Sequence, residues 1–153
     1  MGGSRADEST RKIAYQLGRL IATQGWVLLN GGRASGVMDA SAKGARDAGG
    51  LVIGVLPDTG PGKESAFLDI RIYTGLHHAR NLVNVLSSDI VFACRGEAGT
   101  LSEIALALSN AKKVITVGWN AGESFHEYEE QGLIIQADDP DKAIEIAKDT
   151  LPV

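Results

Sequence analysis

The chain has 153 residues, of which 44% are hydrophobic and 22% are charged, with a formal net charge of −4 at pH 7. This length and composition are typical of one globular domain with its own core, and they exclude a general affinity for nucleic acid or for acidic membranes. No apolar run approaches the ~20 residues that cross a membrane, and the first residues lack the basic and apolar regions of a signal peptide, so we expect a cytoplasmic protein.

Short apolar runs and segments with helical spacing alternate along the whole chain. The predicted strands are 26–29, 51–56, 69–73, 90–94, 114–117 and 133–135. The predicted helices are 7–23, 36–48, a helix through Leu76, Val83 and Leu86, a helix over 100–110, and a last helix that starts at Asp139-Pro140. Crossovers between parallel strands need a helix. The pattern therefore predicts a doubly wound, mostly parallel, Rossmann-like α/β sheet with helices on both faces.

The N-terminus departs from this alternation. Gly2, Gly3 and Ser4 have the form of a strand-to-helix turn, yet almost no chain precedes them to form the strand. The first strand of a doubly wound sheet is usually central, so its loss exposes the middle of the core. We expect a single Rossmann-like domain over residues 1–153 that lacks its first strand, or whose central slot is filled by another segment or subunit.

Cysteines and histidines are too sparse to predict a metal site. Cys94 is the single cysteine, which excludes an internal disulfide and a cysteine-based zinc site. The three histidines, His77, His78 and His126, lack the spacing of metal ligands. We therefore expect no metal site.

Two glycine-rich turns lie at matched places, each between a short apolar run and an alanine-rich helix. They are Gly31-Gly32-Arg33-Ala34-Ser35-Gly36 and Gly96-Glu97-Ala98-Gly99-Thr100. A strand that ends in glycines and reopens as a helix directs backbone N–H groups outward at the positive end of the helix dipole, where a phosphate or similar anion binds. Neither turn matches a P-loop or the Gly-x-Gly-x-x-Gly spacing, which argues against ATP hydrolysis and nicotinamide chemistry. Because both turns follow strands of one parallel sheet, we expect them to hold one extended ligand.

Two charged residues near the second turn have a structural and a functional interpretation. Thr100 and Glu103 have the spacing of a capping box, which alone explains both residues. Glu103 at a ligand-facing helix start is also placed to accept a hydrogen bond or a proton from a bound hydroxyl. Arg80 lies on the helical face opposite the apolar stripe of its helix, either as a solvated side chain or as a partner of an anion at the second turn.

Several longer motifs resemble one protein superfamily. Arg80-Asn81, then Asp89, then the run from Arg95 to Glu103 follow the spacing of the signature of the lysine-decarboxylase-like, or LONELY GUY, superfamily. Within it, the chain is most similar to the molybdenum cofactor carrier proteins. The shared motifs are Gly-Gly-Ser from residue 2, Trp-x-Leu-Leu-x-Gly-Gly-Arg-x-x-Gly-Val-Met from 26, Ile-Gly-Val-Leu-Pro from 53, Thr-Gly-Leu from 74 and Ala-Arg-x-x-x-Asn-x-Leu-Ser-Ser from 79.

The resemblance implies a protein that binds, stores and hands over molybdenum cofactor without catalytic turnover. This cofactor is a pterin with a terminal phosphate and a molybdenum-dithiolene end, so it requires anion cradles and a cleft. The resemblance also implies a homodimer or homotetramer and a molybdoenzyme as recipient. The residues expected to hold the cofactor are Gly3, Ser4, Arg5, Gly31, Gly32, Arg33, Ser35, Gly36, Thr74, Arg80, Gly96, Gly99 and Thr100.

Two other functions remain open. In the cytokinin-activating phosphoribohydrolases of the superfamily, the residues at the positions of Arg80 and Glu103 carry N-glycosidic cleavage, so these two would be the catalytic pair. Here Arg95 replaces the signature proline, Glu97 its second glycine and Asn81 the lysine after the arginine. A side chain at position 97 adds bulk and negative charge where a backbone would approach a phosphate. A general nucleotide-sensing module would need only the two cradles.

Overall fold

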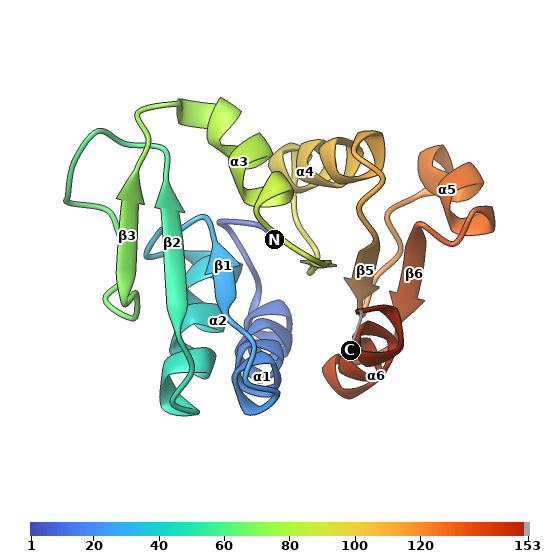
Figure 1. Ribbon diagram of the computed structural model, residues 1–153, viewed down its shortest axis with the longest axis horizontal. Helices are drawn as coiled ribbons and strands as arrows, with labels where there is room; N and C mark the ends of the chain where they lie inside the picture. The colour runs from blue at the N-terminus through green and yellow to red at the C-terminus, as the bar shows by residue number, and fades with distance from the viewer. Residues whose placement is uncertain (152–153) are drawn as a thin grey trace.

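Six short parallel strands form the centre of the molecule, in two half-sheets of three strands each (Figure 1). The computed structural model describes residues 1–151. The strands are β1 (Leu28–Asn30), β2 (Val52–Leu56) and β3 (Ile70–Tyr73) in one half-sheet, and β4 (Val91–Ala93), β5 (Val114–Val117) and β6 (Ile134–Ala137) in the other. β1 and β4 face each other across a groove, so the spatial order is β3-β2-β1-β4-β5-β6.

Helices cover both faces of the strands (Figure 1). They are α1 (Glu8–Thr23), α2 (Gly36–Asp47), α3 (Arg80–Leu86), α4 (Ala98–Ser109), α5 (His126–Glu130) and α6 (Pro140–Thr150), with short 3-10 helices η1 (His77–Ala79) and η2 (Glu123–Phe125). α1 packs against α2 and α6, and α3 packs against α4. The predicted doubly wound α/β fold with parallel strands is therefore confirmed.

Local chemistry fixes where two of the helices begin. The Asp7 carboxylate accepts a hydrogen bond from the Thr10 amide at 2.7 Å, which caps α1. The Asp139 carboxylate accepts one from the Lys142 amide at 2.8 Å, and Pro140 occupies the first position of α6, where its missing N–H costs nothing. Both starts agree with the prediction from sequence.

α1 and α2 cross closely because each contributes a glycine at the contact. A Cβ added at Gly18 would collide with the carbonyl of Ser41, and one added at Gly44 would collide with the carbonyl of Tyr15. These are backbone atoms, so the helices themselves would have to separate. We expect Gly18→Ala to lower the free energy of unfolding by about 1–3 kcal/mol, measured by chemical denaturation. Arg11→Ala, at an exposed position of the same helix, is the matched control and should change it by less than about 0.5 kcal/mol; equal effects would contradict the packing argument.

The predicted orientation of the helix before β4 was wrong. Leu76 and Leu86, expected on its buried face, are 48% and 50% exposed, whereas Arg80 and Asn84 are buried. The segment is a 3-10 turn followed by the seven-residue helix α3, and its polar side faces the interior. On the inner side of α3, buried polar residues therefore take the place of the apolar side chains that the sequence pattern predicted.

The predicted capping box at the start of α4 is also wrong. The helix begins at Ala98, with Glu97 as its N-cap residue, so Thr100 already lies in its first turn. The Thr100 amide donates to the carbonyl of Glu97 at 2.8 Å. Glu103 is thus released from a capping role, which leaves its carboxylate for other contacts.

Candidate functional site

Three glycine turns meet at the carboxyl ends of β1 and β4. The amide of Val37, in the first turn of α2, donates to the carbonyl of Gly3 at 3.1 Å, and the Gly3 amide donates to the carbonyl of Arg95 at 3.3 Å. A Cβ at Gly36 would collide with the Gly3 carbonyl, and one at Gly96 would lie 2.7 Å from the Gly3 nitrogen. The turns predicted to share one edge of the sheet therefore touch one another.

Asn30, at the end of β1, holds the first glycine turn in place. Its Oδ1 accepts a hydrogen bond from the Gly32 amide at 2.8 Å, and its Nδ2 donates to the carbonyl of Met38 at 3.0 Å. Gly32 has a φ of +72°, which favours glycine. Asn30 was not among the residues predicted from the sequence to bind ligand, although an asparagine directly before two glycines is a known turn signal.

Arg80 is buried against this first turn. A Cβ added at Gly31 would lie only 2.5 Å from the Nη1 of Arg80, so the absence of a side chain at Gly31 makes room for the guanidinium. Its Nε is buried and has no hydrogen-bond partner among residues 1–151. Burial lowers the pKa of Arg80, while Glu103 opposes that shift. The side chain nevertheless stays charged, because an arginine is not deprotonated in proteins.

Asn84 and Glu103 complete a buried polar cluster with Arg80. The Oδ1 of Asn84 is also buried and has no partner within the described part of the chain. Burial raises the pKa of Glu103, and the Met1 ammonium and Arg80 partly offset that increase. The buried polar cluster therefore presents an unpartnered N–H and an unpartnered carbonyl oxygen, the kind of groups that a polar ligand or ordered water satisfies.

The raised pKa of Glu103 predicts how stability depends on pH. The Glu103 carboxyl keeps its proton to a higher pH in the folded chain than in the unfolded chain. Its contribution to the free energy of unfolding is therefore complete below the ordinary pKa range of glutamate and is lost as the pH rises through the raised pKa. Glutamine mimics the protonated side chain. We therefore expect Glu103→Gln to raise the thermal midpoint at pH 8 and to change it little at pH 4, measured by calorimetry. A lower midpoint for the variant at pH 8 would contradict the assignment.

The other residues predicted to bind ligand lie around the three turns and differ in their contacts and exposure. Arg33 forms an ion pair with Asp58, with 3.0 Å between Nη2 and Oδ2. The Thr74 hydroxyl donates to the carbonyl of Leu56 at 2.8 Å, so it holds the loop after β3. Ser35 is the N-cap residue of α2 but its side chain makes no capping bond. Ser4, Arg5 and Gly99 are exposed, and the buried Thr100 packs over Gly96.

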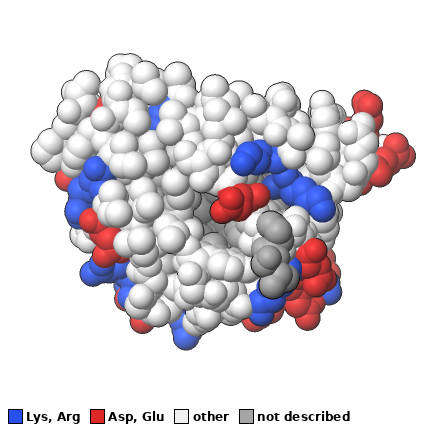
Figure 2. All heavy atoms as spheres, viewed as in Figure 1, with Lys and Arg blue, Asp and Glu red and all other residues white. Residues whose placement is uncertain are grey.

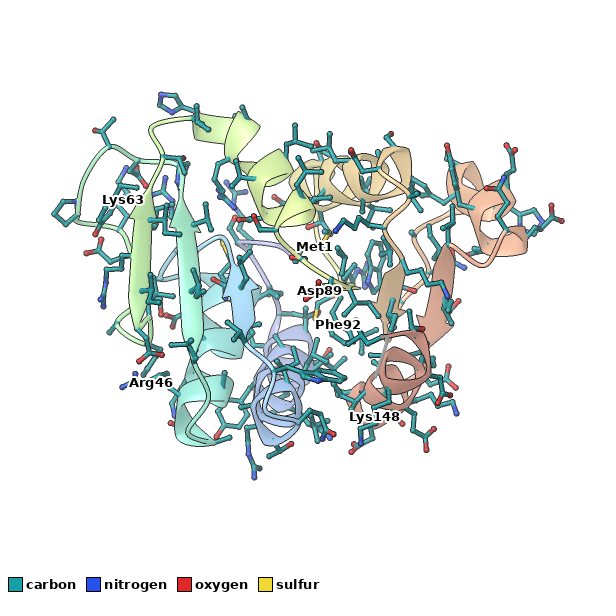
Figure 3. The ribbon with its side chains drawn as sticks, viewed as in Figure 1. Met1, Arg46, Lys63, Asp89, Phe92 and Lys148 are labelled. Carbon is teal, nitrogen blue, oxygen red and sulfur yellow. The ribbon has the colours of Figure 1, made fainter. Side chains whose placement is uncertain are left out.

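A groove of about 450 Å³ runs between β1 and β4, and two members of the buried polar cluster, Asn84 and Glu103, line it. Figure 2 shows the molecule hollowed near the middle of this face, and Figure 3 shows Met1, Asp89 and Phe92 together between the two half-sheets. Asn30, Asn84 and Glu103 contribute polar groups to the groove, whereas most of its remaining lining is apolar. A second groove of about 750 Å³ follows α1 and α2 and includes only Ser35 and Gly36 of the predicted ligand-binding residues.

Neither a metal site nor a membrane span emerges from the described residues. Within residues 1–151, no three His, Cys, Asp or Glu side chains are grouped so that they can hold a metal ion. None of the helices described there combines the length and hydrophobicity needed to cross a bilayer.

Comparisons with known proteins agree over nearly the whole chain. The sequence profile of the SLOG cluster4 family matches residues 1–144. The structure of a molybdenum cofactor binding protein from Rippkaea orientalis is similar, with 46% identity, a TM-score of 0.90, and coverage of 96% of this chain and 91% of that one. The molybdenum cofactor carrier protein of Chlamydomonas reinhardtii matches with 42% identity and a TM-score of 0.88, covering 98% and 92% of the two chains.

A further relative carries an enzyme name. The probable cytokinin riboside 5′-monophosphate phosphoribohydrolase of Oryza sativa subsp. japonica is 34% identical over 107 residues. The alignment covers 68% of this chain but only 47% of the rice protein. The two structural neighbours are therefore the more complete match.

Proposed function

The chain belongs to the SLOG cluster4 family, and from this membership and the geometry of its site we propose that it binds molybdenum cofactor and holds it without catalytic turnover. The resemblance drawn from the motifs is confirmed by the family match and by the neighbours. One observation carries the proposal: a buried arginine with an unpartnered Nε lies directly against a glycine turn at the start of a helix. That arrangement suits the phosphate or another anionic group of the cofactor.

The residues present fit such a cargo. The first turn leads into α2, whose N-terminal end carries a partial positive charge, and Gly31 leaves the space in which the Arg80 guanidinium reaches that turn. We assign one anionic end of the cofactor to this place, and the pterin to the groove side, where Asn84 and Glu103 lie. The other proposed contacts are Gly3, Ser4, Arg5, Gly32, Arg33, Ser35, Gly36, Gly96, Gly99 and Thr100, while Thr74 acts by holding its loop.

The second glycine turn favours binding of a cofactor over hydrolysis of a nucleotide. Glu97 lies at the N-cap of α4 and is exposed, so its carboxylate sits where a nucleotide phosphate would approach the helix start. Like charges repel there, which weakens binding of a nucleoside monophosphate. The polar groups of a carrier need only bind, orient and shield the cargo, and the buried polar cluster suits that role.

Co-purification tests this function. The protein is produced in cells that make molybdenum cofactor, isolated without oxygen, and treated with iodine to convert bound cofactor to its fluorescent pterin. We expect pterin in amounts that approach one per chain, and background amounts in Arg80→Gln. Background amounts in both proteins would argue against the proposal.

The alternative is a phosphoribohydrolase that uses Arg80 and Glu103. It is favoured by the electrostatic attraction between these two residues and by the rice relative. The test is incubation with nucleoside 5′-monophosphates and chromatography of the free base. Robust release that disappears in Glu103→Gln would support the enzyme and contradict a carrier without turnover.

We further propose that the chain works in the cytoplasm as a homodimer or homotetramer and delivers its cargo to a molybdoenzyme. Four leucines around α3 and α4, 37–50% exposed, support a contact with a second copy: Leu76, Leu82, Leu86 and Leu101. Figure 2 shows this upper part of the molecule to be largely uncharged.

Charge placed in this apolar surface should disrupt the oligomer. We expect Leu86→Asp to reduce the mass measured by light scattering to that of a monomer, because a carboxylate is costly to bury at an apolar contact. Ser109→Asp, at an exposed position at the end of α4, is the control and should keep the oligomer. A wild-type protein that is already monomeric would contradict this part of the proposal.

A further inference from the structure

The groove of about 750 Å³ along α1 and α2 has no role in the function proposed above, apart from Ser35 and Gly36. We propose that this α1–α2 groove is a docking site for an extended, acidic segment of a partner protein, the protein that receives the cargo. The identification of the partner as the recipient rests on the proposed function, whereas binding of an acidic segment does not.

Helix α1 separates the α1–α2 groove from the groove that we assign to the pterin. Leu17 and Ile21 line the groove between β1 and β4, whereas Tyr15 and Arg19 line the α1–α2 groove. Two residues along a helix correspond to a rotation of about 200°, so these pairs lie on opposite sides of α1. Figure 1 shows α1 and α2 side by side. A segment bound along them would therefore not compete with the pterin for space.

Basic side chains predominate in the lining of the α1–α2 groove. Its four basic and two acidic residues are Arg11, Lys12, Arg19 and Lys43, with Glu8 and Asp39. The whole chain has a net charge of −4, so this excess of positive charge is local. A groove of this charge attracts an acidic partner and repels a basic one.

Arg11 and Arg19 are the cations of the groove that have no acidic partner. Both are exposed, and neither forms an ion pair within residues 1–151. Lys12 and Lys43, by contrast, each pair with a carboxylate four residues away on the same helix. The Asp39 carboxylate accepts a hydrogen bond from the Ser65 hydroxyl at 2.6 Å, which holds it toward another loop. The two arginines are therefore free to bind the carboxylates of a partner.

The spacing of the two arginines favours an extended occupant over a small anion. A helix rises about 1.5 Å per residue, so Arg11 and Arg19 lie about 12 Å apart along α1. One phosphate or carboxylate group does not span that distance. About four residues of extended chain do, at about 3.3 Å per residue, and they can place a carboxylate beside each guanidinium.

Apolar groups lie between the charges of the groove. Leu20, Ala40 and Tyr15 contribute to its lining. The Tyr15 hydroxyl donates to the Asp47 carboxylate at 2.8 Å, and the Lys43 Nζ lies 5.4 Å from the centroid of its ring, so the ring is held in place. These groups suit a peptide in which apolar side chains separate the carboxylates. A nucleic acid carries continuous negative charge, which the net negative charge of the chain repels outside the groove.

The α1–α2 groove also reaches the first glycine turn. Ala34, Ser35 and Gly36 of that turn belong to its lining. We place one anionic end of the cofactor at the same turn. A partner segment in the groove would therefore lie next to the cargo, as delivery to a recipient requires.

The experiment measures peptide binding to the cofactor-free full chain by fluorescence anisotropy. The probe is fluorescein-labelled Gly-Asp-Glu-Leu-Asp-Glu-Leu-Asp-Gly, and the control peptide has Asn and Gln in place of Asp and Glu. The double variant Arg11→Glu with Arg19→Glu is compared with Arg71→Glu with Lys148→Glu, whose sites are exposed and lie outside the groove. Both double variants change the net charge equally. Thermal midpoints check that each variant folds.

We expect saturable binding of the acidic peptide, no binding of the control peptide, and weaker binding as salt is added. The affinity should fall at least about tenfold in Arg11→Glu with Arg19→Glu and less than about twofold in the control variant. In the wild-type chain, the peptide should shift the amide NMR signals of Tyr15 and Ala40 but not that of Ile115 in buried β5. This last measurement needs no substitution.

Four results would overturn the proposal. They are the absence of saturable binding to the wild-type chain, equal losses in the two double variants, displacement of the peptide by an equal concentration of inorganic triphosphate, and shifts confined to signals outside the groove. Dissociation of a wild-type oligomer by Arg11→Glu with Arg19→Glu, without peptide, would also overturn it, because a second copy would then occupy the groove. Cofactor binding is measured separately, so failure of either proposal leaves the other standing.

Discussion

Alanine at Gly31 is expected to weaken binding of molybdenum cofactor at least about tenfold while the fold persists. The added Cβ would lie 2.5 Å from the Nη1 of Arg80 and 2.6 Å from the Sδ of Met38. Both atoms are the far ends of flexible side chains, so they can shift without moving the backbone. A displaced guanidinium loses a charge-assisted hydrogen bond to the cargo, worth about 1.5–3 kcal/mol.

This prediction is tested by titration of Gly31→Ala with isolated cofactor under anaerobic conditions, together with its thermal midpoint. Gly60→Ala is the matched control, since a Cβ at that glycine meets nothing within 4 Å. Unchanged affinity of Gly31→Ala would place Arg80 outside the binding site. A large fall in the thermal midpoint of unfolding would mean that the substitution had disrupted the turn itself rather than the position of the arginine.

Replacement of Arg80 by glutamine is expected to reduce cofactor affinity by about 10- to 100-fold. The substitution removes the buried charge and the unpartnered Nε that the ligand is proposed to satisfy. Arg80→Lys should recover part of the loss, because it restores the charge without the planar fork. Arg46→Gln is the control, since that arginine side chain is 46% exposed and pairs with Asp69 rather than lying in the buried polar cluster.

The two Arg80 variants also distinguish the effect of the positive charge from the effect of the planar guanidinium. Full recovery in Arg80→Lys would mean that a point charge suffices at the first turn. No loss in Arg80→Gln would contradict the site. The affinity of each Arg80 variant is measured by the fluorescence of the bound pterin, and the dissociation rate of the cofactor is measured on the same samples.

The sequence predicted those parts of the fold that local chemistry controls. The ends of α1 and α6 follow from Asp7 and Asp139, whose carboxylates cap the next turn. The short strands follow from continuous apolar runs, except β3, which follows from an alternating one. The meeting of the glycine turns follows from parallel topology, which brings strand ends to one edge.

The features of the fold and the site that were predicted wrongly or missed depend on contacts that a single sequence does not reveal. Arg80 and Asn84 look like the solvated side of an amphipathic helix, but the fold buries them next to Glu103 and the first turn. The capping box failed because α4 starts two residues earlier, at Ala98. The pairing of Arg33 with Asp58 joins residues from two different loops, and no periodic pattern encodes it.

The central claim is that this chain holds molybdenum cofactor rather than consuming a nucleotide. An anaerobic titration with isolated cofactor, followed by pterin fluorescence and run in parallel with a nucleoside monophosphate under the same conditions, tests it most directly. We predict saturable binding near one cofactor per chain, weakened in Arg80→Gln, with no free base from the nucleotide. Absence of saturable cofactor binding, together with Glu103-dependent release of base, would contradict the claim.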